Sequence, residues 1–417
     1  MMREIKELSI LAIAPSLWFG GAQVVTLELF NLMKSRVKLK VLTCDGADPK
    51  FLDALNSMGI ETYRVPCRTL LGYPILARGQ ARKLVEWADV VWTTDVEYSV
   101  APRIKRVKNV PVVAHIHSYA LVCPWWGAMY GLREVCVARC SAWRIVGCKQ
   151  GINMELARVG LLDGVRAGAY WLLDFGKGPL DYFRWKRIVD TSVDSVDVFI
   201  AVSNATRDIV VSHLPEARDR VEVVYNPAAH RPWRYVSSLP ERRGNYIFYA
   251  GGANLNKGPH ILLRAFKLLR EWGIDVELVM TGTAGTWVEA LARRYGVGQG
   301  VGFLEKLPEG EYFRLMAGAG ATVLPSVWPE PLPTVAVESV SLGVPVVGSG
   351  LGGIPEIVDK YGAVAPPLPE KIAEAVVKVL EMRYDREEMR LYAHKKFGVE
   401  NVERLVEIFN KVAGSRG

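Results

Sequence analysis

Short apolar runs alternate along this chain with stretches in which apolar residues recur at helical spacing. The run at 8–15 ends in proline, Gly20 and Gly21 follow, and Val24 and Leu27 open a stretch of helical spacing. This order predicts a strand, a glycine turn and a helix. Further apolar runs, rich in Val and Ile like buried parallel strands, lie at 37–43, 89–94, 110–117, 197–202 and 221–225.

The same alternation restarts after residues 226–244, which are richer in Pro, Arg and Ser and which we interpret as a linker. Strands are expected at 246–250, 276–280, 301–303, 321–324, 344–347 and 363–366, and helices at 257–272, 309–317, 333–342 and 370–382. This pattern predicts an α/β fold with a doubly wound parallel sheet in each half. We expect domains at 1–228 and 229–385, and C-terminal helices at 386–417 that pack back across the linker.

The length of 417 residues agrees with two domains, because it exceeds what one ordinary core accommodates. The net charge is +8, but no long run of Lys and Arg is present, so we expect no nucleic-acid partner. Two uncharged stretches, 8–27 and 109–132, contain proline and polar residues that a spanning helix would place in lipid. We interpret both as buried strands leading into loops and expect a cytoplasmic protein; an N-terminal signal peptide is the alternative.

Two glutamates flank the expected start of the helix at 333–342. Glu330 lies in the loop after the strand at 321–324, and Glu338 lies on the second helical turn. The N-terminus of such a helix offers N–H groups to an anion such as a diphosphate, and each carboxylate can accept hydrogen bonds from hydroxyl groups. Spacing alone favours the simpler interpretation, in which both glutamates are solvated surface charges.

Several motifs in this order resemble those of the retaining glycosyltransferases of family four, which have the two-domain GT-B fold. The motifs are Phe19-Gly-Gly-Ala-Gln23, Asn256-Lys-Gly-Pro259, the pair Glu330 and Glu338, Leu342-Gly-Val-Pro-Val-Val-Gly348 and Gly352-Gly-Ile-Pro-Glu-Ile-Val358. The resemblance covers nearly the whole chain and is weak at about 125–195. It implies two Rossmann-like domains facing a central cleft, and transfer of a hexose-type sugar from a nucleoside diphosphate sugar to a glycan or lipid-linked acceptor.

The resemblance also implies roles for individual residues. Glu330 would hold hydroxyl groups of the transferred sugar, and Glu338 would hold the ribose hydroxyls of the nucleotide. The donor-binding loop before the helix would consist of Pro331, Leu332 and Pro333.

Lys257 would neutralise the diphosphate as the leaving group gathers charge, and the amides of Gly20 and Gly21 would approach that diphosphate closely. Without the resemblance, Gly20-Gly21 is equally well an ordinary strand–helix turn. Because these groups would take the leaving charge, no cofactor is expected for catalysis. The family usually has an arginine at the position of the donor-site residue Gly252, so a second cation must come from elsewhere or N–H groups replace it.

His115 and His117 end the strand expected at 110–117, and a period of two puts both on one face. The family has a histidine just before Asp or Ser at this strand end, near the donor sugar, and His117-Ser118 matches it. The resemblance therefore implies a catalytic role for His117 and leaves His115 open. Asp95 and Glu97 follow another strand end, where they can reach an acceptor.

Four of the six cysteines, Cys123, Cys136, Cys140 and Cys148, lie close together in the chain. Their spacing allows a structural zinc site with four thiolates. Disulfide bonds and free thiols are the alternatives.

Aromatic and basic residues gather at 164–189. This composition suits peripheral contact with the anionic inner face of a membrane that carries a lipid-linked acceptor. The alternative is a core-packing helix with a solvated basic face.

Two other functions fit the same scaffold: a nucleotide-sugar epimerase and a non-catalytic sugar-nucleotide-binding subunit. The glutamate pair and the Gly352-Gly353 stretch favour transfer over epimerisation, whereas Gly252 is the main argument for a non-catalytic subunit.

Overall fold

The computed structural model describes residues 7–14, 16, 20–66, 79–137, 139–162, 164–236 and 244–415. The chain divides into two compact units. The first consists of residues 1–126, 181–227 and 399–417, and the second of residues 127–180 and 228–398. Residues 127–180 were expected in the first domain, whereas in the structure this segment groups with the second unit. The second unit resumes at residue 228, one residue before the expected boundary.

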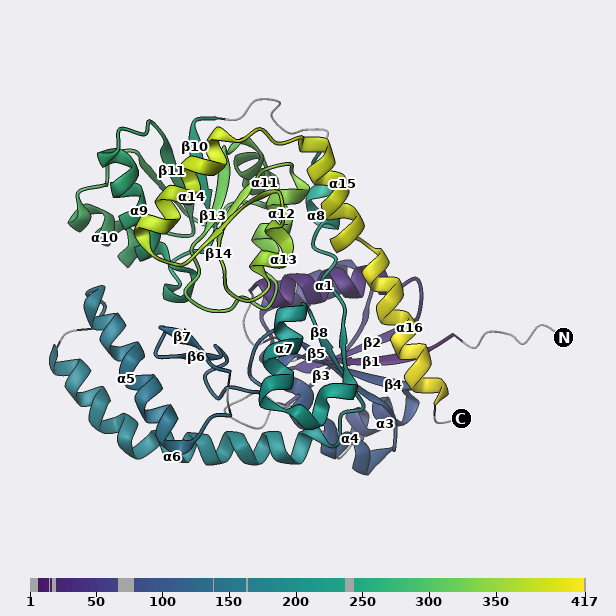
Figure 1. The fold of residues 1–417 in the computed structure, drawn as a ribbon. Coiled ribbons are helices and arrows are strands. Elements are labelled where there is room, and N and C mark those ends of the chain that lie inside the picture. The colour runs from purple at the N-terminus through teal and green to yellow at the C-terminus, as the bar shows by residue number, and fades with distance from the viewer. Residues whose placement is uncertain are drawn as a thin grey trace. The chain divides into compact units, whose positions relative to one another are not determined.

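The first unit is built on a seven-stranded sheet in the order β3-β2-β1-β4-β5-β8-β9 (Figure 1). Every neighbouring pair in this sheet is parallel. The strands are β1 Ser9–Ile13, β2 Lys38–Cys44, β3 Glu61–Val65, β4 Val90–Thr94, β5 Val112–Ile116, β8 Val198–Ala201 and β9 Val221–Val223. The helices of this unit are α1 Gly21–Met33, α2 Pro49–Ser57, α3 Gly79–Trp87, η1 Asp95–Val100, α4 Ala101–Val107, α7 Asn204–His213, η2 Pro215–Arg220 and α16 Glu400–Gly414.

Helix α16, from the far end of the chain, completes the core of the first unit. Phe409 is fully buried, and its ring lies 5.7 Å from that of Trp92 on β4. Phe30 of α1 contacts the same indole edge-on at 5.2 Å. A strand, an early helix and the last helix therefore share one aromatic cluster.

The second unit contains a six-stranded parallel sheet in the order β12-β11-β10-β13-β14-β15. Its strands are β10 Tyr246–Tyr249, β11 Glu277–Thr281, β12 Val301–Leu304, β13 Ala321–Leu324, β14 Val346–Ser349 and β15 Gly362–Ala365. Its helices are α8 His230–Trp233, η4 Leu255–Lys257, α9 Pro259–Glu271, α10 Trp287–Tyr295, α11 Glu309–Gly318, α12 Thr334–Ser341, α13 Ile354–Val358, α14 Pro369–Glu381 and α15 Arg386–Phe397. The segment 127–180 adds the antiparallel pair β6 Met129–Tyr130 and β7 Glu134–Val135, and the helix α5 Ala142–Arg158. The long helix α6 Gly164–Val193 continues into the first unit.

Both faces of the second sheet are covered. Along β10, Ile247 and Tyr249 pack on one face with α9 and α14, and Phe248 packs on the other with α11. Side chains alternate between the faces of a strand, so a continuous apolar run such as this one requires helices on both sides. The doubly wound α/β architecture is confirmed in each half.

The expected strands of the two parallel sheets are present within a few residues of their predicted bounds, but β3 was not predicted. The two C-terminal helices belong to different units. Helix α15 packs against α12 in the second unit, and α16 packs against α1 in the first. Among the helices in the described ranges, none combines the length and apolar character needed to cross a membrane.

The substitution Phe409→Ala should lower the free energy of unfolding of the first unit by about 3–5 kcal/mol, because it leaves a cavity beside Trp92. Glu407→Ala, on the exposed side of the same helix, should change it by less than about 0.5 kcal/mol. Chemical denaturation followed by tryptophan fluorescence measures both variants. Equal stability of Phe409→Ala and wild type would show that α16 does not belong to this core.

Candidate functional site

The order of strands in the second sheet reverses direction between β10 and β13. In open parallel sheets, the segments that leave two such strands diverge and leave space for a ligand at the carboxyl edge. Lys257 lies in the segment after β10, at the end of η4, and Glu330 lies in the segment after β13. The topology therefore brings together two residues that are 73 positions apart in the sequence.

Lys257 and Glu330 form a direct ion pair. The lysine Nζ donates to both carboxylate oxygens, at 2.8 and 2.7 Å, and the hydroxyl of Ser326 donates to Oε1 at 2.6 Å. Glu330 is 2% exposed, whereas the Lys257 side chain is 31% exposed. An ammonium has three hydrogens, so the third N–H of Lys257 remains for an additional acceptor at its exposed side.

Two glycines allow this pair to form. Gly258 adopts φ +70°, and a Cβ there would lie 2.0 Å from the carbonyl oxygen of Pro325. Gly352 adopts φ +63°, and a Cβ there would lie 2.2 Å from the carbonyl oxygen of Glu330. That same carbonyl accepts the N–H of Gly353 at 2.7 Å. The close backbone contacts thus hold the segments on which Lys257 and Glu330 lie.

The absence of an arginine at position 252 also has a local structural reason. Gly252 adopts φ +60°, a region that side-chain-bearing residues rarely occupy. The Tyr249 hydroxyl donates to its carbonyl at 3.1 Å. At the preceding Gly251, a Cβ would lie 2.3 Å from the same hydroxyl oxygen. The loop is therefore shaped for two glycines.

Glu338 lies on α12 and is 3% exposed. Arg231 donates to its Oε1 at 2.9 Å, and the hydroxyl of Tyr312 donates to Oε2 at 2.8 Å. Arg231 also forms a short ion pair with Glu309. Burial raises the pKa of Glu338, and the charge of Arg231 opposes this rise. Arg231 was not predicted as a site residue, because it lies 107 positions from Glu338 in the sequence and only the fold brings the two together.

The loop Pro331–Pro333 leads directly into α12, with Pro333 as the residue before its first turn. Leu332 is buried. A small cavity of about 50 Å³ lies against this helix start and is also lined by Gly251, Lys257 and Ser326. The first residues of α12, Lys257 and Gly251 therefore line one cavity.

In the first unit, Gly20 is the residue before α1, and its N–H donates to Gln23 Oε1 at 3.1 Å. Gly20 has an extended backbone with φ −147°, and Gly21 is the first helical residue. The expected strand, glycine turn and helix are present, although Phe19 lies outside the described residues. The geometry leaves both interpretations open: a close approach to a diphosphate and an ordinary turn.

His115 and His117 lie on one face at the end of β5, as expected, with ring centroids 4.3 Å apart. Both ring nitrogens of His115 and Nε2 of His117 are buried and have no hydrogen-bond partner within the described part of the chain. Burial lowers the pKa of His117 to about 4. Burial, together with the neighbouring His117, lowers the pKa of His115 well below its usual value. Both imidazoles are therefore neutral at pH 7.

Two carboxylates lie at the end of the neighbouring strand β4. Burial raises the pKa of Asp95 to about 6, although hydrogen bonds from Ser118 and the amide of His117 oppose it. Burial and the charge of Asp95 raise the pKa of Glu97 well above its usual value. Asp95 also has a left-handed backbone with φ +53°. The carboxyl edge of the first sheet thus gathers buried, weakly partnered polar groups, which favours a ligand there.

None of Cys123, Cys136, Cys140 and Cys148 is disulfide-bonded. The Cys148 thiol donates to the carbonyl of Met129 at 3.2 Å and thereby holds the end of β6 against α5. Over the ranges that the structure describes, no three His, Cys, Asp or Glu side chains are arranged to hold a metal ion. The zinc hypothesis stays a prediction that this geometry does not support.

Two family models match nearly the whole chain. Residues 19–230 match the model described as Glycosyltransferase Family 4, and residues 235–396 match Glycosyl transferases group 1. The spore coat protein SA of Bacillus subtilis is 26% identical over 52% of this chain and 66% of its own length. An uncharacterised glycosyltransferase of Methanocaldococcus jannaschii is 31% identical over 43% of this chain and 50% of its own. The chain thus spans less than two thirds of the length of these relatives.

Among solved structures, Anabaena HepE in complex with UDP-glucose superimposes with a TM-score of 0.67 at 17% identity. The match covers 97% of this chain and 100% of that chain. At this identity the likeness shows the fold, and the expected fold of two parallel-sheet domains is confirmed.

The substitution Asp95→Asn should change how stability depends on pH. The folded pKa of about 6 lies above the unfolded value near 4, so the folded protein binds an additional proton between these values. Lowering the pH from 7 to 4 should therefore stabilise wild type relative to Asp95→Asn, by at most about 3 kcal/mol. Asn tolerates the left-handed backbone at this position.

Thermal unfolding of both proteins between pH 4 and pH 8 measures this difference. The two neutral histidines titrate in both proteins. Loss of the Asp95 charge also lowers the pKa of Glu97 in the variant, which changes the comparison in the same direction. A stability difference that does not vary with pH would contradict the raised pKa of Asp95.

Proposed function

The chain belongs to glycosyltransferase family 4, and on this premise we propose that it transfers a hexose-type sugar from a nucleoside diphosphate sugar to a glycan or lipid-linked acceptor, with retention of configuration. The observation that carries the proposal is the Lys257–Glu330 pair at the carboxyl edge of the second sheet. The solved relative with the same fold was crystallised with UDP-glucose, which supports a nucleoside diphosphate sugar as the donor here.

The donor would lie at the start of α12. The N–H groups of this helix and the third N–H of Lys257 would bind the diphosphate. The carboxylate of Glu330, already held by Lys257 and Ser326, would accept hydroxyl hydrogens of the sugar. Glu338 would accept those of the ribose, because each carboxylate oxygen has a second lone pair beyond the bond it receives from Arg231 or Tyr312.

In the reaction, the bond between the anomeric carbon and the diphosphate oxygen breaks, and the acceptor oxygen bonds to that carbon on the same face. The acceptor proton passes to the departing diphosphate. Lys257 stabilises the charge on the leaving group, so no divalent metal is needed. A glutamate nucleophile is disfavoured because Glu330 and Glu338 are each held by a cation, which lowers carboxylate reactivity.

The acceptor side would use the first sheet. The neutral imidazole of His117 can accept a hydrogen bond from a sugar hydroxyl through its unpartnered Nε2. Asp95 and Glu97 at the neighbouring strand end can position an acceptor hydroxyl.

A donor screen tests the proposal. Thermal stabilisation of the purified protein by UDP-, GDP- and ADP-sugars should single out one nucleotide, and Glu338→Gln should weaken that donor about tenfold through loss of one charged acceptor. Glu311→Gln, an exposed change on the neighbouring helix, serves as the matched control and should leave the shift unchanged. No stabilisation by any donor would contradict the proposed donor site. A donor that stabilises the protein without being turned over would favour the non-catalytic sugar-nucleotide-binding subunit, for which Gly252 is the supporting observation.

The substitution Lys257→Met should lower the rate of donor hydrolysis at least about a hundredfold, because a preorganised charge on the leaving group is lost. Lys267→Met on the exposed side of α9 is the matched control and should keep the wild-type rate. Nucleotide release followed by chromatography measures both, and added EDTA should not alter either rate. Wild-type hydrolysis by Lys257→Met would contradict the assigned role, and an epimerised donor in place of free nucleotide would contradict transfer.

A further inference from the structure

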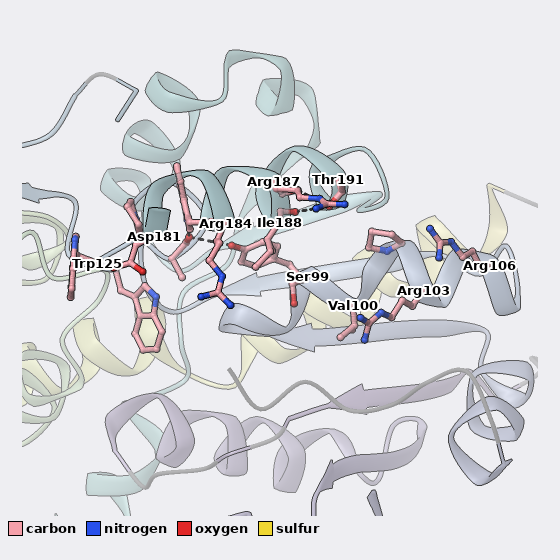
Figure 2. A pocket seen from close by; sticks show the side chains of 16 residues that line it. Ser99, Val100, Arg103, Arg106, Trp125, Asp181, Arg184, Arg187, Ile188 and Thr191 are labelled. Carbon is pink, nitrogen blue, oxygen red and sulfur yellow. Dashed lines mark hydrogen bonds between the residues drawn. The ribbon is translucent and has the colours of Figure 1, made fainter. Parts of the chain in front are cut away.

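The first unit contains a pocket of about 840 Å³ that the roles assigned above do not use. Its walls come from η1 with α4, from the segment 120–126, and from the second half of α6 (Figure 2). Helix η1 follows β4 directly, and Ala120 follows His117 by three residues. The pocket therefore lies at the carboxyl edge of the first sheet, beside the predicted acceptor groups.

The walls of this pocket are tied to one another. The carbonyl oxygen of Ala120 accepts the hydroxyl of Tyr98 at 3.1 Å and the indole N–H of Trp185 at 2.8 Å. These two bonds join η1, the segment 120–126 and α6. The buried hydroxyl of Ser99 on the lining has no hydrogen-bond partner in the part of the chain that the structure describes. The pocket is thus preformed and offers a polar group to a ligand.

Four guanidinium groups line the pocket: Arg103 and Arg106 from α4, and Arg184 and Arg187 from α6 (Figure 2). All four residues are exposed, and within the described ranges none forms an ion pair with a carboxylate. Asp181 is the one acidic residue on the lining. A concentration of guanidinium groups without matching carboxylates is complementary to a phosphate or diphosphate, which it binds in bidentate fashion.

The rest of the lining is largely apolar. Trp125, Trp126 and Trp185 present indole rings, and Ile188 and Val100 add aliphatic surface. Trp125 is 45% exposed, which is unusual for so large an apolar side chain. A free phosphate would use the arginines alone, so the apolar surface indicates a ligand that carries an apolar group beside its phosphoryl group.

We propose that this pocket binds a phosphate or diphosphate together with the first part of an apolar chain attached to it, as in the lipid carrier of a glycan acceptor. The identification of this ligand as an acceptor rests on the proposed function. Binding of a lipid phosphate in the pocket does not depend on sugar transfer. On this proposal, the basic and aromatic residues of α6 serve to bind a lipid phosphate.

Binding of farnesyl diphosphate to the full chain, in the absence of donor, tests the proposal. Tryptophan fluorescence reports binding because three tryptophans line the pocket. Arg184→Gln and Arg187→Gln should each weaken the affinity about tenfold, the effect of one charge-assisted contact. Lys186→Gln removes the same charge from the same helix at a residue outside the lining, paired with Asp190, and should change the affinity less than about twofold.

Two further ligands distinguish the contribution of the phosphoryl group from that of the apolar chain to the affinity. Inorganic pyrophosphate and farnesol should each bind at least about a hundredfold more weakly than farnesyl diphosphate. Pyrophosphate binding as tight as that of farnesyl diphosphate would overturn the lipid half of the proposal, and equally tight farnesol would overturn the phosphoryl half. Equal weakening by Lys186→Gln would show general attraction to a basic helix and overturn the site.

Donor stabilisation of the same variants keeps the two proposals apart. Arg184→Gln and Arg187→Gln should retain the wild-type thermal shift with the donor. Arginine-dependent binding of farnesyl diphosphate without any response to donors would uphold the pocket and overturn the proposed transfer. A normal donor response with no binding of farnesyl diphosphate would overturn the pocket proposal and leave the proposed transfer intact.

Discussion

The carboxylate of Glu330 is the group on which the geometry of the second unit depends. An ionised carboxylate that is 2% exposed is strongly destabilising unless a cation and hydrogen bonds satisfy it. Lys257 and Ser326 provide them. For the lysine to reach, the chain at Gly258 must pass against Pro325, and the loop at Gly352 must pass against Glu330 itself. The ion pair therefore depends on glycine at positions 258 and 352.

The fold could be predicted from the sequence because buried parallel strands leave a simple pattern. Runs such as 246–250 and 344–347 are apolar on both faces, and glycine or proline follows many of the runs. Strand β3 was missed because three of its five residues, Glu61, Thr62 and Arg64, are polar, as its place at the edge of the sheet allows. The grouping of 127–180 with the second unit was also missed, since no composition shift marks either end of this segment.

Part of the candidate site could also be predicted from the sequence, and part of it could not. The strand-end positions of His117, Lys257 and Glu330 follow from local pattern and motif order, and period two placed His115 and His117 on one face correctly. The assigned roles of these residues still stand as predictions. By contrast, Arg231 beside Glu338 depends on contacts between distant segments, as does the pocket formed by α4 and α6. The left-handed backbone of Gly252 is a property of loop geometry, which one sequence by itself does not reveal.

Helix α16 has a consequence for how the molecule is made. Its core residues are needed by the first unit, yet they follow the entire second unit in the chain. Domains usually fold in order as the ribosome releases them, but here the first unit stays incomplete until the last helix has emerged. The apolar surface around Trp92 that α16 covers therefore stays exposed to solvent until synthesis of the last helix is finished.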